Sequence, residues 1–164
     1  MYLNCHSYFS LRYGTFSIEE LVQAAVRNGL PYLALTDIHV TTGVFDFVKC
    51  CHENGIKPIV GMEVRHTDRL SYIALAANHD GLKEINDLVT RHNLRETVLP
   101  TVQPEFSNVF VFYPSHNVPD RLKPNEYIGI SRSDLQTFKH PLLRKSDQLV
   151  ALNPVTFQDD QHFE

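Results

Sequence analysis

Four side chains that could act on a phosphate ester follow predicted strands of this 164-residue chain. His6 follows the first apolar segment, Asp37 and His39 follow the second, and Glu63 ends the third. Because the working face of a parallel α/β architecture lies at the carboxyl ends of its strands, these imidazoles and carboxylates could meet on one rim. Such a donor set suits Zn²⁺ or Mn²⁺, which could activate water for hydrolysis.

A structural role is the competing interpretation of the same residues. The chain has nine histidines, so some fall near strand ends by chance, and Asp37 could simply cap the turn or helix that follows it. Spacing alone favours this interpretation. Cys5 and Cys51 fit core positions, and the adjacent pair Cys50-Cys51 makes neither redox chemistry nor a disulfide framework the favoured interpretation of the three cysteines.

The elements that would position these residues alternate between helices and strands. Ser17 and Glu20 form a capping box that predicts a helix start, and Asn28-Gly29 followed by Pro31 predicts its end. A second helix is expected between residues 44 and 53, and a third from about residue 80.

The predicted strands are short apolar runs, and they continue into a proline-rich second half. That half also has a helix signal at 133–138. The predicted strands cover residues 32–36, 59–64, 70–76, 109–113, 127–130 and 149–152. This alternation indicates an α/β fold with mostly parallel pairing, as a doubly wound sheet or as a barrel.

Composition limits the possible functions. The net charge of -4 and pI near 6.1 argue against a chain that holds DNA on its own basic surface. No apolar run approaches the roughly 20 residues of a membrane span, and the first residues lack the plan of a signal peptide. We therefore expect a cytoplasmic protein with no membrane partner.

Three segments resemble the polymerase and histidinol phosphatase (PHP) domain that opens the alpha subunit of bacterial DNA polymerase III. Asn4–Thr15 resembles the family's opening motif, His-x-His-Ser followed by Ser-Leu-x-Asp-Gly, and Ala34–His39 resembles Leu-Thr-Asp-His-Gly. Gly55–Glu63 is similar to the Gly-Ile-Lys-Pro-Ile-x-Gly-x-Glu segment of the alpha subunit. The opening Tyr2-Leu3-Asn4 and Thr41-Thr42-Gly43 look most like members of the Bacteroidetes type.

The resemblance implies a fold and a domain assignment. The expected fold is a partial or distorted (βα) barrel of the PHP type, with about seven mostly parallel strands and crossover helices. Residues 1–164 would form the N-terminal part of one PHP domain, with dense motif matches over 1–95 and a proline-rich continuation over 96–164. Since family members run longer, the chain is expected to be truncated or an expressed fragment.

Several positions depart from the metal-binding pattern that the resemblance implies. Where metal-binding relatives have ligands, this chain has Asn4, Tyr13, Ile38 and Ser71. An isoleucine in place of a histidine removes a donor and adds an apolar group, which leaves too few ligands for a metal cluster.

The remaining candidates form a vestigial metal site. His6 and Glu63 match the family pattern, Asp37 keeps its motif position, and His39 lies one residue late. No catalytic residue and no cofactor are expected, with zinc or manganese bound only if this degenerate site still holds metal.

The resemblance also implies a role in DNA replication. The chain would stabilise a DNA-directed DNA polymerase and contact the remainder of the alpha subunit and replisome or proofreading subunits, reaching DNA only through the parent enzyme. The alternative is an active metal-dependent phosphoesterase or 3′-5′ exonuclease that uses His6, Asp37, His39 and Glu63.

Overall fold

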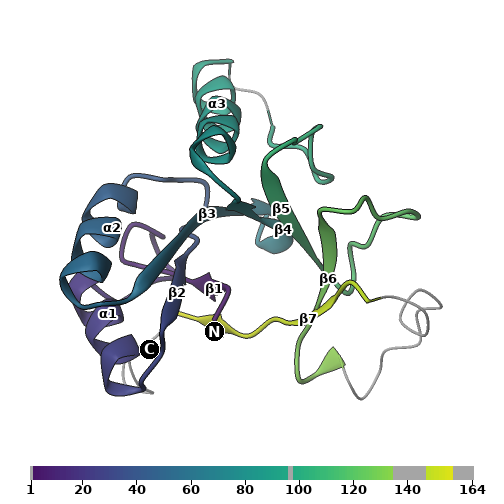
Figure 1. Cartoon of the computed structure of the whole chain (residues 1–164). Coiled ribbons are helices and arrows are strands. Elements are labelled where there is room, and N and C mark those ends of the chain that lie inside the picture. Colours follow the sequence, from purple (N-terminus) through teal and green to yellow (C-terminus); the bar gives the residue numbers. More distant parts are fainter. Residues whose placement is uncertain (1, 96–97, 135–146, 157–164) are drawn as a thin grey trace.

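The computed structural model describes residues 2–95, 98–134 and 147–156. Within these ranges the chain forms three helices and eight strands (Figure 1). The helices are α1 (Ile18–Arg27), α2 (Val44–Glu53) and α3 (His79–Arg95). The strands are β1 (Asn4–Cys5), β2 (Tyr32–Leu35), β3 (Lys57–His66), β4 (Arg69–Ala76), β5 (Val109–Pro114), β6 (Glu126–Ile130), β7 (Leu149–Ala151) and β8 (Pro154–Val155).

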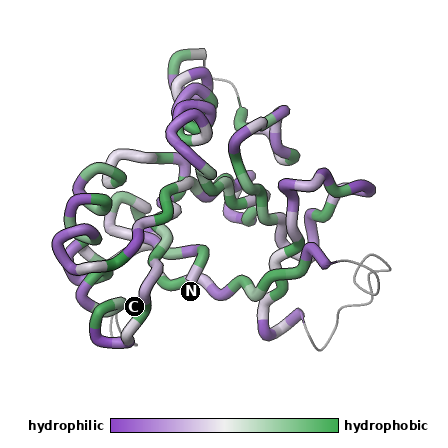
Figure 2. Tube along the Cα trace, in the orientation of Figure 1, coloured by the Kyte–Doolittle hydropathy of each residue, from purple (hydrophilic) through white to green (hydrophobic). Residues whose placement is uncertain are grey.

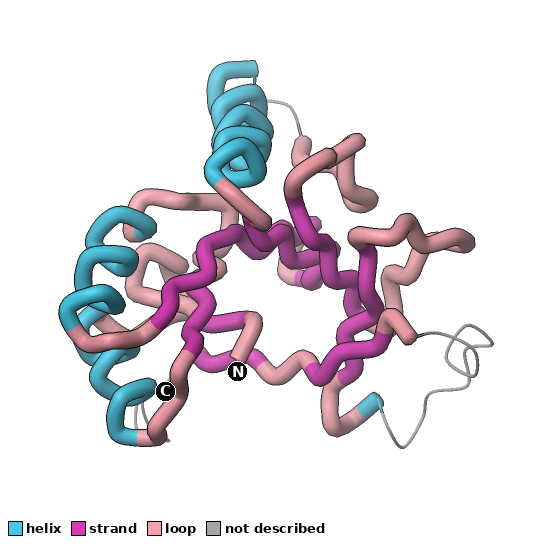
Figure 3. The backbone as a smooth tube through the Cα atoms, viewed as in Figure 1, coloured by secondary structure: helices cyan, strands magenta, loops and turns pink. Residues whose placement is uncertain are grey.

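The strands lie in two sheets that curve around a common interior (Figure 3). The larger sheet has the strand order β2-β3-β4-β5-β6-β7, and β1 pairs with β8 in the smaller one. The Thr36 amide donates to the Cys5 carbonyl at 2.9 Å, which joins the smaller sheet to the end of β2. The predicted α/β class and the partly closed, barrel-like curvature are confirmed.

The strand β4 departs from the repeating crossover pattern. It pairs antiparallel with β3 and β5, whereas the other strand pairs are parallel. Only Thr67 and Asp68 separate β3 from β4, and a parallel return would need a crossover of a dozen or more residues. The sheet is therefore mixed, although most of its pairs are parallel, as expected.

The strands alternate their side chains between the interior and the helix-covered outside. On β4, Ile73 packs into the interior cluster with Phe112 and Leu152, while Tyr72 packs outward in a second cluster with residues of α3, including Ile85. This period of two gives one sheet two apolar faces, which explains the continuous apolar runs in the sequence. Figure 2 shows the resulting hydrophobic colouring along the strands.

The helices α1 and α2 cover one side of β2. The capping box predicted for α1 is present, since the Ser17 hydroxyl accepts from the Glu20 amide and the Glu20 carboxylate accepts from the Ser17 amide. Cys5 and Cys51 are fully buried in the core shared by these helices, as their core interpretation predicted. None of the described helices is long and apolar enough to cross a bilayer. The short helix predicted at 133–138 lies largely outside the described residues.

Candidate functional site

Glu63 lies at the centre of the candidate site, near the end of β3. Its side chain is fully buried, and three protein groups contact its two carboxylate oxygens. Oε2 accepts from Asn4 Nδ2 at 2.8 Å and lies 2.9 Å from His6 Nε2, and Oε1 accepts from Arg65 Nε. Burial by itself raises the pKa of Glu63, but the hydrogen bond and charge interaction with His6, followed by the charge and hydrogen bond of Arg65, hold it below its ordinary value.

His6 and Asn4 reach Glu63 from β1 and the residue that follows it. A carboxylate only accepts hydrogen bonds, so the proton of His6 must be on Nε2. The other ring nitrogen, Nδ1, is buried and has no partner among the described residues. Asn4 is fixed in turn by Thr36, whose hydroxyl donates to Asn4 Oδ1 at 2.9 Å. Both side chains therefore serve Glu63 as hydrogen-bond donors.

Asp37 is engaged with the loop that follows β1. Oδ1 accepts from the Ser7 amide at 2.7 Å and from the Ser10 hydroxyl at 2.6 Å, and Oδ2 accepts from the Ser7 hydroxyl at 2.7 Å. Gly14 allows this loop to fold tightly, because a Cβ there would lie 1.9 Å from the Ser7 carbonyl oxygen. The arrangement agrees with the structural interpretation of Asp37 as a residue that holds a turn.

His39 points to the backbone of β3. Its Nε2 accepts from the Arg65 amide at 2.8 Å, and burial, the largest influence, lowers its pKa below the ordinary value. The backbone of His39 has φ of 58°, a left-handed conformation that favours glycine. The family motif has glycine at this position, so the displaced histidine occupies a glycine conformation and its ring turns toward Arg65.

Arg65 is a site residue that the sequence interpretation missed. It lies two positions after Glu63 on β3, so both side chains fall on the same face of the strand. The guanidinium carbon lies 4.1 Å from the centre of the Tyr13 ring, and the Tyr13 hydroxyl donates to Asp68 at 2.9 Å. The period of two from Glu63 was the signal that could have identified Arg65.

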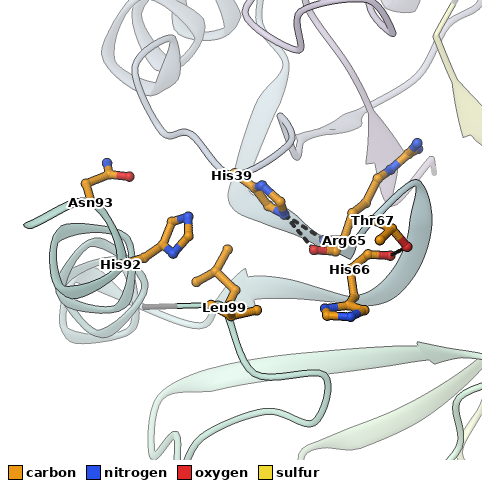
Figure 4. Close-up of a pocket in the computed structure, with 8 residues that line it drawn as sticks. His39, Arg65, His66, Thr67, His92, Asn93 and Leu99 are labelled. Carbon is orange, nitrogen blue, oxygen red and sulfur yellow. Dashed lines mark hydrogen bonds between the residues drawn. The ribbon is translucent and has the colours of Figure 1, made fainter. Parts of the chain in front are cut away.

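A cavity of about 530 Å³ lies beside this group (Figure 4). His39, His66 and His92 line it together with Arg65, and the rings of His39 and His92 are 6.1 Å apart. Figure 4 shows the Arg65 side chain extending away from His92. His6, Asp37 and Glu63 are absent from the lining, so this cavity does not open onto the buried carboxylates.

The structure brings the four predicted site residues to one rim without making their side chains converge. The Glu63 amide donates to the Asp37 carbonyl at 3.1 Å, and the His39 amide donates to the Glu63 carbonyl at 3.0 Å, so their backbones are adjacent. Of these four residues, His6 and Glu63 are hydrogen-bonded to each other through their side chains. Over residues 2–95, 98–134 and 147–156, no three His, Cys, Asp or Glu side chains are grouped to hold a metal.

The donor set therefore does not fit a metal in this arrangement. Each carboxylate oxygen of Glu63 and Asp37 already accepts at least one protein hydrogen bond, and Arg65 places a positive charge beside Glu63. A cation would have to displace these donors and approach a guanidinium. At two other departures from the ligand pattern, the side chain of Ile38 supplies no donor, and Ser71 is buried on β4.

Comparison with known proteins identifies the family. The PHP domain family model matches residues 3–117. Over 166 aligned residues the chain is 29% identical to a DNA polymerase III subunit alpha of Staphylococcus aureus, covering 98% of this chain and 15% of that protein. It is 40% identical over 90 residues to the same subunit of Chlamydia muridarum, covering 55% of this chain and 7% of that protein.

Among solved structures, the chain is similar to an amidohydrolase from Chromobacterium violaceum, at 21% identity and a TM-score of 0.40, over 57% of this chain and 34% of that one. The chain covers 15% and 7% of the two polymerase subunits described above, so it spans a small part of the relatives that it matches. On the extent of the family match, the chain belongs to the PHP domain family and is related to the N-terminal region of DNA polymerase III alpha subunits.

Proposed function

We propose that this chain is a non-catalytic PHP domain that stabilises a replicative DNA polymerase. The observation that carries the proposal is the occupation of Glu63 and Asp37 by protein donors. Glu63 accepts from Asn4, His6 and Arg65, and Asp37 accepts three hydrogen bonds from Ser7 and Ser10. Buried hydrogen-bond networks make a core rigid, and here the hydrogen bonds to the two carboxylates join β1, the end of β2 and β3.

The proposed partners of this chain are inferred from the proteins to which it is related. The matched proteins are polymerase subunits, so the remainder of an alpha subunit is the first expected partner, with replisome or proofreading subunits next. DNA would be reached only through the parent enzyme, since the chain carries a net charge of -4. A Bacteroidetes-type parent stays a prediction from the opening motif.

The rival function is a metal-dependent phosphoesterase or 3′-5′ exonuclease with zinc or manganese on His6, Asp37, His39 and Glu63. It would require Asp37 to release Ser7 and Ser10 and His39 to turn from the Arg65 amide. These rearrangements would break the hydrogen bonds that hold the loop after β1.

Hydrolysis assays distinguish the two functions. The chain is incubated with Mn²⁺ or Zn²⁺ and either p-nitrophenyl phosphate or 3′-labelled single-stranded DNA, beside His6→Ala and the control His79→Ala, an exposed histidine. We expect wild type and both variants to match the buffer rate. Activity that survives in His79→Ala but disappears in His6→Ala would establish the phosphoesterase. Primer extension by the chain alone would also contradict the proposal.

A further inference from the structure

We propose that Arg65 is a built-in counter-cation for Glu63, so that a side chain of this protein supplies the positive charge that a metal would otherwise bring to the site. The inference deepens the proposed function and rests on it, because it explains how the site stays folded without metal. It concerns three residues in contact: Glu63, Arg65 and Tyr13.

The first step is the cost of the buried charge. Glu63 is fully buried, and both of its oxygens accept from donors, Oε2 from Asn4 and His6 and Oε1 from Arg65, so neither oxygen carries a proton and the side chain is a carboxylate. An isolated charge in a protein interior is strongly unfavourable unless it is paired and hydrogen-bonded. The fold therefore needs a positive group close to Glu63.

The second step identifies that group. Asn4 is neutral, and His6 contacts Glu63 through Nε2 while its Nδ1 has no partner among the described residues. Arg65 is always charged, and its Nε donates to Glu63 Oε1.

The third step is that the guanidinium is held in place. Arg65 is only 15% exposed, and it lies over the Tyr13 ring with 4.1 Å between the guanidinium carbon and the ring centre. The Tyr13 hydroxyl donates to Asp68, so the ring that supports the guanidinium is itself anchored. Aromatic faces attract guanidinium groups, and desolvation strengthens the attraction. Tyr13 thus positions the cation over the carboxylate.

A double-mutant cycle on the full chain tests the inference. Melting temperatures are measured with a chelator present for wild type, Arg65→Ala, Glu63→Gln and the double variant. Arg65→Ala should lower the melting temperature by about 5–10 °C, because it leaves a buried carboxylate without its cation. In the Glu63→Gln background, where no charge needs compensation, the same substitution should cost less than half of that loss.

The matched control is Arg69→Ala, an exposed arginine on the neighbouring strand that should change the melting temperature by no more than about 1 °C. If Arg65→Ala does not fold, folding of the double variant supports the inference, and failure of both overturns it. Equal losses in the two backgrounds would also overturn it, since Arg65 would then act through packing alone. Stoichiometric metal on wild type would instead refute the proposed function.

Discussion

Replacing Asp37 is an informative single perturbation, because three protein hydrogen bonds hold its carboxylate and the same carboxylate is a candidate metal ligand. Its carboxylate accepts from the Ser7 amide, the Ser7 hydroxyl and the Ser10 hydroxyl at 2.6–2.7 Å. Asp37 and Ser7 are both buried, so water cannot replace the lost acceptor. We compare Asp37→Asn, which keeps the shape, with Asp37→Ala, which removes every acceptor.

The expected cost follows from the hydrogen bonds. A hydrogen bond to a charged group contributes about 1.5–3 kcal/mol, and a buried donor left unpaired costs about 1–3 kcal/mol. Asp37→Asn keeps one acceptor oxygen for the Ser7 amide but loses the charge, so it should reduce the free energy of unfolding by about 2–3 kcal/mol. Asp37→Ala should cost about 4 kcal/mol or more, since Ser7 then has a buried, unpaired amide.

The assay is urea unfolding at neutral pH, with chelator and separately with Zn²⁺ or Mn²⁺. The control Asp120→Asn removes an exposed carboxylate and should stay within about 0.5 kcal/mol of wild type. If Asp37 is structural, its losses are the same with and without metal, and the m-value is unchanged. A loss that appears only with metal and vanishes with chelator would refute the reasoning and make Asp37 a ligand.

Three further predictions concern other parts of the structure. His39→Gly should be more stable than His39→Ala by about 1 kcal/mol in thermal unfolding, because both lose the ring but only glycine suits the left-handed backbone; equal stability would contradict this. Burial raises the pKa of Cys5 and Cys51 to about 12, so mass spectrometry should show alkylation of the half-buried Cys50 first, and early modification of the other two would contradict their burial. Burial by itself raises the pKa of Glu84, but hydrogen bonds from Asn108 and Ser107 lower it on balance. The contribution of Glu84 to stability should therefore be present above pH 4.5 and lost as the pH falls through the lowered pKa of the native state. Glu84→Gln should abolish that part of the pH dependence of unfolding, and an unchanged pH profile would contradict the prediction.

Much of the fold was predictable because local patterns specify it. The Ser17–Glu20 capping box depends on residues three apart, and the strand and helix order follows from apolar periodicity. The antiparallel pairing of β4 could be predicted only from the short Thr67–Asp68 connection, which is too short for a parallel crossover. The alternation of helices and strands elsewhere in the chain favoured parallel pairing instead. Curvature into a partly closed barrel was an expectation from family resemblance, since strand order alone fits two architectures.

The candidate site was predictable in position but not in contacts. The rule that functional residues lie at the carboxyl ends of parallel strands predicted that His6 and Glu63 share one rim, and their side chains do contact each other. The hydrogen bonds that the Asp37 carboxylate accepts come from a loop 27–30 residues earlier in the chain, and no local sequence pattern specifies the conformation of that loop. Arg65 was not predicted because arginine is not a metal-binding residue type, although its spacing from Glu63 indicated a shared face.

Metal content is the measurement that tests the central claim most directly. The full chain is purified without a metal-affinity tag, equilibrated with Zn²⁺ and Mn²⁺, separated from free metal and examined by elemental analysis. Since protein donors occupy Glu63 and Asp37, we predict far less than one metal per chain, and the same trace amount in Glu63→Gln. Stoichiometric metal that falls on substitution of His6 or Glu63 would contradict the account and establish a working metal centre.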